Sequence, residues 1–182
     1  MRVLQKFGPF TFCKLESPEE VNLFYFEQKS VDGTTGFSFF RGYGIIDYVS
    51  SFKSWLRKFP RPVFIIALLD KEIVSWVFIE PWLHDALDGE PVYVLRAIET
   101  KPDFQGKKIG YRLVLLGCNE VPGYIITKPV TKNSERFFLN FGFMHPQDFR
   151  KCPINLTSNP GHLILPPFKK KLILDNLEKY FG

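Results

Sequence analysis

The chain has 182 residues, of which 45% are hydrophobic and 24% are charged, a composition typical of one globular domain spanning residues 1–182 and not of a disordered chain. The net charge of +5 is uneven, because residues 1–91 sum to −2 and residues 92–182 sum to +7. An anionic partner is therefore expected on the second half, if there is one.

Several classes of protein are disfavoured at this stage. No apolar run approaches the roughly 18 residues of a transmembrane helix, and the first residues lack the apolar segment of a secretory signal. The cysteines Cys13, Cys118 and Cys152 form no CxxC pair, and the three histidines are scattered. We therefore expect a cytoplasmic protein with reduced thiols, without a metal site and without contact with a membrane.

The first sixty residues are predicted to form a strand and two helices. Residues 9–16 alternate as in a strand, and Ser17 followed by Pro and two Glu residues predicts a helix that runs to about residue 29. A loop rich in Gly and Phe follows at residues 33–44. Apolar residues then recur at helical spacing over residues 45–59.

The middle of the chain is predicted to be β structure. Residues 63–69 and 73–79 flank a short polar turn and are typical of a hairpin. Residues 80–90 form an acidic loop, and residues 92–100 form another strand. The central hairpin argues against a purely parallel sheet.

The remaining elements alternate between helix and strand. They are expected as a loop at 101–110, a helix at 110–119, a strand at 123–130, a helix at 132–141, a strand at 162–166 and a helix at 168–180. The sequence thus predicts a mixed α/β (α+β) domain.

The loop before the helix at 110–119 has the composition of a phosphate-binding site. Residues 104–113 read Phe-Gln-Gly-Lys-Lys-Ile-Gly-Tyr-Arg-Leu, which places small residues and lysines at a helix start. Free backbone N–H groups and the positive end of the helix dipole bind phosphate there. Alone, this loop is weak evidence, because glycine often only closes a turn.

A second segment, combined with this loop, indicates a particular protein family. Residues 131–143 read Thr-Lys-Asn-Ser-Glu-Arg-Phe-Phe-Leu-Asn-Phe-Gly-Phe, a helix that ends in Gly-Phe after a strand. Together with Thr100 to Gly110, this segment resembles the two signatures of the GNAT superfamily of acetyl-CoA-dependent N-acetyltransferases. The motifs cover about a third of the chain, and the order of elements agrees along nearly all of it.

The resemblance implies a mostly antiparallel central sheet with helices on both faces, which splays between the strands at 92–100 and 123–130. Acetyl-CoA would lie in that gap as the acyl donor, and a primary amine would attack it directly. Residues of the strand end, the loop and the second motif would bind the donor: Ile98, Glu99, Thr100, Gln105, Gly106, Lys107, Lys108, Ile109, Gly110, Tyr111, Thr131, Ser134 and Phe138. Basic residues are expected around the CoA phosphates: Lys101, Lys107, Lys108, Arg112, Lys128, Lys132 and Arg136.

Three residues depart from the family pattern. Lys108 stands where the family usually has the central Gly of its phosphate loop, and Thr131 stands where Asn is common. Phe138 stands where many members carry the Tyr hydroxyl that protonates the departing thiolate. If the alignment holds, Phe138 cannot supply that proton.

The catalytic base is expected near the acceptor. Glu80, at the end of its strand, is the candidate, although a solvated carboxylate explains it at least as well. Tyr124, at the start of a strand lining the gap, could replace the missing Tyr hydroxyl, although plain packing explains it better. By the strand period of two, Tyr93 and Glu99 share one face and Arg96 lies on the other. Acidic residues in the loop at 80–90 favour a cationic amine, either small or on a peptide.

The sequence also allows two other functions. A non-catalytic CoA-binding or protein-interaction module would explain the missing Tyr. Nucleic-acid binding, suggested by the pI near 9.1, is the less favoured alternative. The many Phe residues leave room for a homodimer surface.

Overall fold

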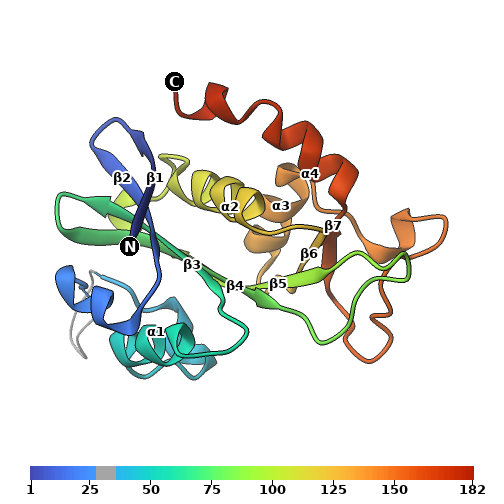
Figure 1. Ribbon diagram of the computed structural model, residues 1–182, viewed down its shortest axis with the longest axis horizontal. Helices are drawn as coiled ribbons and strands as arrows, with labels where there is room; N and C mark the ends of the chain where they lie inside the picture. Colours follow the sequence, from blue (N-terminus) through green and yellow to red (C-terminus); the bar gives the residue numbers. More distant parts are fainter. Residues whose placement is uncertain (28–35) are drawn as a thin grey trace.

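The protein is described by a computed structural model that covers residues 1–27 and 36–182 (Figure 1). Its strands form one sheet in which each strand lies beside its successor in the chain. All neighbours are antiparallel except β5 and β6, which are parallel. The strands are β1 (Arg2–Phe7), β2 (Phe10–Leu15), β3 (Val63–Leu69), β4 (Glu72–Pro81), β5 (Val92–Thr100), β6 (Tyr124–Thr127) and β7 (Leu163–Leu165).

The helices lie on both faces of the sheet, as expected (Figure 1). α2 (Ile109–Glu120), α3 (Lys132–Phe141) and α4 (Pro167–Leu174) contribute to one apolar core, which includes Phe12 and Ile65 of the sheet. α1 (Tyr48–Leu56) packs a second, aromatic core on the opposite face around Trp76. No helix among the described residues is long and apolar enough to cross a bilayer.

The sequence predictions are confirmed for the elements nearest the two motifs. The central hairpin, β5 and α3 lie where they were expected, and α2 begins one residue earlier. Asp47 begins α1, because its side chain accepts hydrogen bonds from the amides of Val49 and Ser50. The helix expected over 45–59 is correspondingly shorter.

Other predictions near the two ends of the chain are wrong. β1 was missed, and it pairs with β2 through a tight turn at Gly8. The helix expected from residue 18 is a 3-10 turn, Pro18–Leu23, after which Tyr25 bridges to Glu72; the end expected near residue 29 lies outside the described residues. The C-terminal helix stops at Leu174 and resumes as a 3-10 turn, Leu177–Tyr180.

A bulge in β5 overturns the expected facing of its side chains. The register between β4 and β5 shifts opposite Arg96, between Leu95 and Ala97. Tyr93 therefore packs on the core beneath α2, whereas Ala97 packs on the core beneath α1. Because one extra residue reverses the alternation, Glu99 lies on the opposite face from Tyr93, and its carboxylate reaches α1.

The sheet opens between β5 and β6. Their pairing begins at Val92 with Tyr124 and ends at Leu95 with Thr127, after which β5 continues to Thr100 without a partner on that side. β6 was expected to reach residue 130 but stops at Thr127, shortly before Pro129, whose ring nitrogen cannot donate to a ladder. The gap predicted from the resemblance is therefore present.

Candidate active site

A cleft of about 390 Å³ occupies the gap between β5 and β6, and we call it the splay cleft. Its walls come from the unpaired end of β5, the chain after β6, the start of α3 and the turn after residue 36. The residues that line the cleft include Arg96, Ile98, Glu99, Lys128, Ser134 and Phe138.

The backbone of Ile98 faces this cleft. The Glu99 carbonyl accepts a hydrogen bond from Ser75 on the β4 side, at 2.9 Å. Because adjacent residues of a strand direct their N–H and C=O groups to opposite sides, Ile98 and Thr100 direct theirs toward the gap. The Thr100 carbonyl accepts from the Gln105 side chain at 3.2 Å, which leaves the Ile98 groups open to a ligand.

The loop between β5 and α2 presents backbone amides at the end of the same cleft. The first hydrogen bond of α2 runs from the Arg112 amide to the Lys108 carbonyl, so the amides of Ile109, Gly110 and Tyr111 have no acceptor within the helix. Lys108 adopts the left-handed conformation, with φ of 58°, that usually requires glycine. Lys108 therefore adopts a backbone conformation that glycine takes without strain, at the position where the resemblance leads us to expect glycine.

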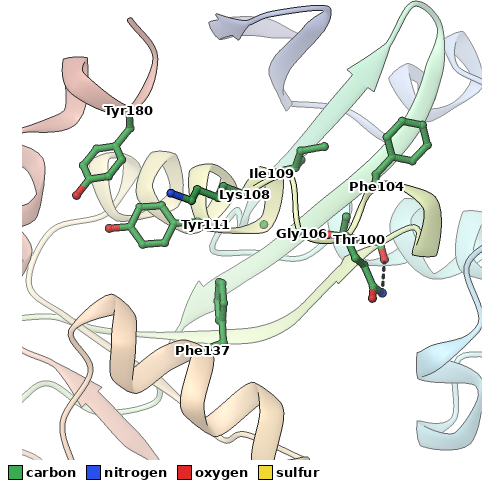
Figure 2. A pocket seen from close by; sticks show the side chains of 10 residues that line it. Thr100, Phe104, Gly106, Lys108, Ile109, Tyr111, Phe137 and Tyr180 are labelled. Atoms are coloured by element: carbon green, nitrogen blue, oxygen red, sulfur yellow. Dashed lines mark hydrogen bonds between the residues drawn. The ribbon is translucent and has the colours of Figure 1, made fainter.

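A second cavity, of about 540 Å³, adjoins this loop, and we call it the loop cavity (Figure 2). Thr100 and Gln105 line both hollows, so the two form a continuous surface. Aromatic rings from four segments line the loop cavity: Phe104, Tyr111, Phe137 and Tyr180. The sequence pointed to Tyr111 but missed Tyr180, which lies at the far end of the chain and belongs to no motif.

Glu99 is the only carboxylate among the described residues that line the splay cleft. One oxygen accepts hydrogen bonds from the amides of Ser38 (3.1 Å) and Phe39 (2.9 Å), and the other accepts from the Tyr48 hydroxyl (2.8 Å). Burial raises the pKa of the Glu99 carboxyl, and these hydrogen bonds offset part of the rise. Sequence reasoning had placed Glu99 here for its backbone and had not anticipated its side chain.

Glu80 lies outside the described lining of both hollows. Its oxygens accept from Lys58 at 2.8 Å and from Arg96 at 2.7 Å. Burial opposes ionisation, but the two cations hold the pKa of the Glu80 carboxyl below its ordinary value. This carboxylate is engaged in ion pairs and is poorly suited to take up a proton near neutral pH.

Tyr124 and the acidic loop lie at the other end of β5. Tyr124 pairs with Val92, where the two strands begin, whereas the sheet opens after Leu95. Its hydroxyl donates to Asp88 at 2.7 Å, and burial together with this bond raises the pKa of Tyr124 to about 12. The acidic loop, which led the sequence analysis to favour a cationic amine, therefore lies outside the lining of the splay cleft.

The start of α3 brings the other motif residues into the cleft. Thr131 and Ser134 form a reciprocal cap, in which the Ser134 amide donates to Thr131 Oγ1 and the Thr131 amide donates to Ser134 Oγ, at 3.1 and 3.0 Å. Phe138, one turn later, is 3% exposed and lines the cleft with its ring. No hydroxyl is present at that position.

Two of the basic residues expected around the CoA phosphates contact other groups of the protein instead. Lys101 is buried and forms ion pairs with Glu27 and Glu72. Arg112 is also buried, and its guanidinium donates to the carbonyls of Tyr180 and Lys108. Lys107 and Lys108 are exposed beside the loop, while Arg96 and Lys128 line the splay cleft.

A family model establishes which family the chain belongs to. Residues 31–143, which include β5, the loop, α2 and α3, match the acetyltransferase (GNAT) family model. The chain belongs to the GNAT acetyltransferase family. Family membership makes acetyl-CoA the acyl donor and N-acetyl transfer the class of reaction. Among curated protein sequences, none matches the chain.

Solved structures share this fold at low sequence identity. The AtaTR complex bound with acetyl-CoA matches with a TM-score of 0.61 and 14% identity, covering 90% of this chain and 97% of that one. The KacTA–DNA complex gives 0.65 and 9%, covering 92% and 99%. AtaT complexed with acetyl-methionyl-tRNAfMet gives 0.58 and 12%, covering 90% and 98%.

Proposed function

We propose that this GNAT member transfers the acetyl group of acetyl-CoA to a primary amine by direct attack within the splay cleft. The observation that carries the proposal is the meeting of two features: β5 presents the unpaired backbone of Ile98 to the gap, and the amides at the start of α2 face the end of the same gap. The unpaired backbone of Ile98 suits the amide groups of a pantetheine arm. The amides at the start of α2 suit a pyrophosphate.

The described residues fit the donor. Amides from Gly106 to Tyr111 would hold the pyrophosphate, and the backbone of Ile98 would hold the pantetheine arm. When bound, acetyl-CoA supplies an activated thioester, whose acetyl group passes to a neutral amine while the thiol leaves. The Ile98 N–H is the donor positioned to stabilise negative charge on the thioester oxygen.

Glu99 is our candidate for binding the acceptor nitrogen and taking up its proton. A carboxylate offers about four acceptor sites, and the amides of Ser38 and Phe39 and the Tyr48 hydroxyl occupy three. Among residues 1–27 and 36–182 no other group donates to the remaining site, which would accept from the amine directly or through a water. The raised pKa of Glu99 moves it closer to the working pH of a general base.

The departing thiolate does not require a side chain that donates a proton. Phe138 offers no proton, and the nearby Ser134 hydroxyl already donates to the Thr131 carbonyl at 2.8 Å. A thiol has a pKa of about 8.5, so its thiolate is a tolerable leaving group near neutral pH and takes its proton from solvent.

The acceptor class is left open between two candidates. Glu99 suits any primary amine, small or on a peptide. However, Arg96 and Lys128 also line the cleft, and Lys132 and Arg136 are exposed on α3. These cations favour an amine attached to an anionic carrier, and a neighbour of the same fold is complexed with acetyl-methionyl-tRNAfMet. An aminoacyl-tRNA is therefore the second candidate.

The reaction is tested by thiol release from acetyl-CoA, measured with a thiol reagent against a panel of amines. We expect steady release well above the blank with at least one amine. Binding of acetyl-CoA without release on any amine would favour the non-catalytic alternative, and the absence of binding at millimolar acetyl-CoA would overturn the proposal.

The acceptor class is tested by comparing methionyl-tRNA with a short peptide amine at several salt concentrations. A strong preference for the tRNA that falls steeply with salt would support the anionic carrier. Equal turnover of both acceptors with no dependence on salt would support a small amine.

A further inference from the structure

The bulge in β5 places Arg96 in the wall of the splay cleft. Arg96 is the extra residue of the bulge, because the register between β4 and β5 passes from Leu95 directly to Ala97. A bulge redirects the side chain of its extra residue, and Arg96 lines the same cleft as Glu99, three residues later. The end of β5 therefore brings one cation and one carboxylate to a single hollow.

Two neighbours orient the Arg96 guanidinium and leave its outer nitrogens open. Its Nε donates to Glu80 Oε1 at 2.7 Å, and its Cζ lies 5.5 Å from the centroid of the Trp82 ring. The other Glu80 oxygen accepts from Lys58 at 2.8 Å. Among residues 1–27 and 36–182, no group accepts a hydrogen bond from Nη1 or Nη2 of Arg96. These two nitrogens form a planar fork, which matches the two oxygens of a carboxylate.

The charges of the splay cleft suit an acceptor that carries both a positive and a negative group. Among the described residues that line it, Arg96 and Lys128 are cations and Glu99 is a carboxylate. The His162 ring, 5.7 Å from that of Trp82, adds no charge near neutral pH, because burial lowers the pKa of His162. A purely cationic amine would bring its charge close to two like charges, whereas a zwitterion adds no net charge and pairs with both signs.

A partly exposed aromatic ring borders the Glu99 carboxylate. Phe39 donates its backbone amide to Glu99 at 2.9 Å, lines the cleft and is 41% exposed. The Tyr43 ring stacks on it with centroids 5.3 Å apart, and Phe40 anchors the same turn to the core, 5.5 Å from the Trp76 ring. A substituent on the carbon beside the bound nitrogen would lie next to Phe39, and an apolar substituent would bury surface there.

We infer that the acceptor is a free α-amino acid with an apolar side chain, whose carboxylate binds Arg96 while its nitrogen binds Glu99. This inference rests on the proposed function and narrows its small-amine candidate. Glu99 takes one proton from the ammonium group, and the nitrogen then forms its bond to the acetyl carbon. The C–S bond breaks with its electron pair on sulfur, which takes a proton from solvent, and the nitrogen loses its second proton to solvent. The product is an N-acetylamino acid.

A comparison of paired substrates in paired variants tests the inference. Each apolar L-amino acid is assayed beside its carboxamide, which keeps the amine and the side chain but lacks the negative charge. The wild type should prefer the best amino acid to its amide in kcat/KM. Arg96→Met should lower kcat/KM by about 30-fold for the amino acid and leave that for the amide nearly unchanged. The change in this ratio between variants is independent of the amine pKa of each substrate.

Two further variants separate the fork from the charge and the fold. Arg96→Lys keeps a cation without the planar fork, so its ratio should lie between those of the wild type and Arg96→Met. Arg150→Met removes an exposed arginine outside the lining of both hollows, and it should behave like the wild type. Phe39→Ala should lower kcat/KM more for phenylalanine than for alanine, and an equal effect on the two would overturn the apolar side chain.

The remaining outcomes distinguish this inference from the proposed function. An equal loss for amino acid and amide in Arg96→Met, or no loss for either, would overturn the carboxylate contact. Acetylation of other amines but of no amino acid would overturn the substrate class and leave the proposed function intact. Phosphoethanolamine carries a phosphate in place of the carboxylate, and its acetylation above that of every amino acid would also overturn the class. A wild-type protein that does not bind acetyl-CoA would overturn the proposed function itself.

Discussion

The two sides of the splay cleft that we propose for the donor and for the acceptor are formed by different kinds of groups. The donor side consists mainly of backbone: the unpaired end of β5 and the amides that open α2. The acceptor side consists of side chains, with Glu99 held by Tyr48 of α1 and by the amides of Ser38 and Phe39. Backbone geometry follows from local sequence, whereas these side-chain contacts depend on elements distant in the chain.

The difference between backbone and side-chain recognition matches the difference between a constant donor and a particular acceptor. A donor that is always the same molecule can be recognised by groups that every residue carries, provided that the loop has the required shape. A particular acceptor is recognised by side chains, which differ from one sequence to another. We expect substitutions of small residues to affect the donor side most, and substitutions of charged residues to affect the acceptor side most.

The largest effect is expected for Gly110→Val. A Cβ at Gly110 would lie 3.3 Å from Thr100 Oγ1 and 3.7 Å from Ile98 Cδ1, so a branched side chain must move the first turn of α2 away from β5. Losing one or two amide hydrogen bonds to a charged phosphate costs about 3 kcal/mol, or about 100-fold in the Kd of CoA. Calorimetric titration measures it.

Gly42→Val is the matched control, because a Cβ at exposed Gly42 meets no atom within 4 Å. It should bind CoA like the wild type. Equal affinity of Gly110→Val and Gly42→Val for CoA would show that the start of α2 does not hold the donor.

On the acceptor side, Glu99→Gln should lower kcat/KM by about 100-fold at pH 7. The amide keeps an acceptor for the amides of Ser38 and Phe39 but cannot take up a proton. In the wild type, activity should rise with pH through the raised pKa of Glu99, and the variant should lose this acidic limb. A pH profile of kcat/KM measures both effects, and an unchanged limb would remove Glu99 from the proton transfer.

Glu80→Gln should lower the stability of the fold and leave the proton transfer unchanged. It should keep the acidic limb but lower the free energy of unfolding at pH 7 by about 1–2 kcal/mol, because Lys58 and Arg96 lose a charged partner. The Glu80 pKa is lowered in the folded state, so its stabilisation is present above the ordinary value of about 4.3 and disappears as the pH falls through the folded pKa. Chemical denaturation at pH 7 and pH 3 measures it, and an equal loss at both would contradict the ion-pair explanation.

The smallest effect concerns the departure of the phosphate loop from the family pattern. Lys108→Gly should stabilise the fold by about 1 kcal/mol, because a non-glycine residue in the left-handed conformation costs about that much. Thermal unfolding measures it. Lys107→Gly is the control, since its side chain lies 4.8 Å over the Phe104 ring and its backbone is not in that conformation. A lower melting temperature for Lys108→Gly would show that the Lys108 side chain stabilises the loop.

The sequence located the loop before α2 and the start of α3, but it did not predict the surroundings of Glu99, for physical reasons. Gly106 and Gly110 and the cap of α3 at Thr131 act within one turn, so their spacing alone indicates the loop and the helix start. The bulge at Arg96 changes no local pattern, yet it reverses the side chains after it and carries Glu99 to the α1 face. The two-residue alternation of side chains along a strand does not indicate such a bulge.

The choice of Glu80 and Tyr124 as catalytic candidates had the same weakness. Both lie at strand ends, but a strand has two ends, and the sequence does not say where pairing stops. The pairing of β5 with β6 begins at Tyr124 and opens at Thr127, which places Tyr124 at the closed end. The partners of Glu80 and the position of Tyr180 likewise come from contacts between distant segments.

In the complex that we propose, acetyl-CoA lies on the unpaired end of β5 with its pyrophosphate at the start of α2. Titration of the ¹⁵N-labelled protein with CoA, followed by NMR through backbone amide shifts, tests it directly. We expect saturable shifts at Ile98 and from Gly106 to Tyr111, with little change at Glu80 and Tyr124. Shifts concentrated near Tyr124, or none at the loop with millimolar CoA, would contradict it.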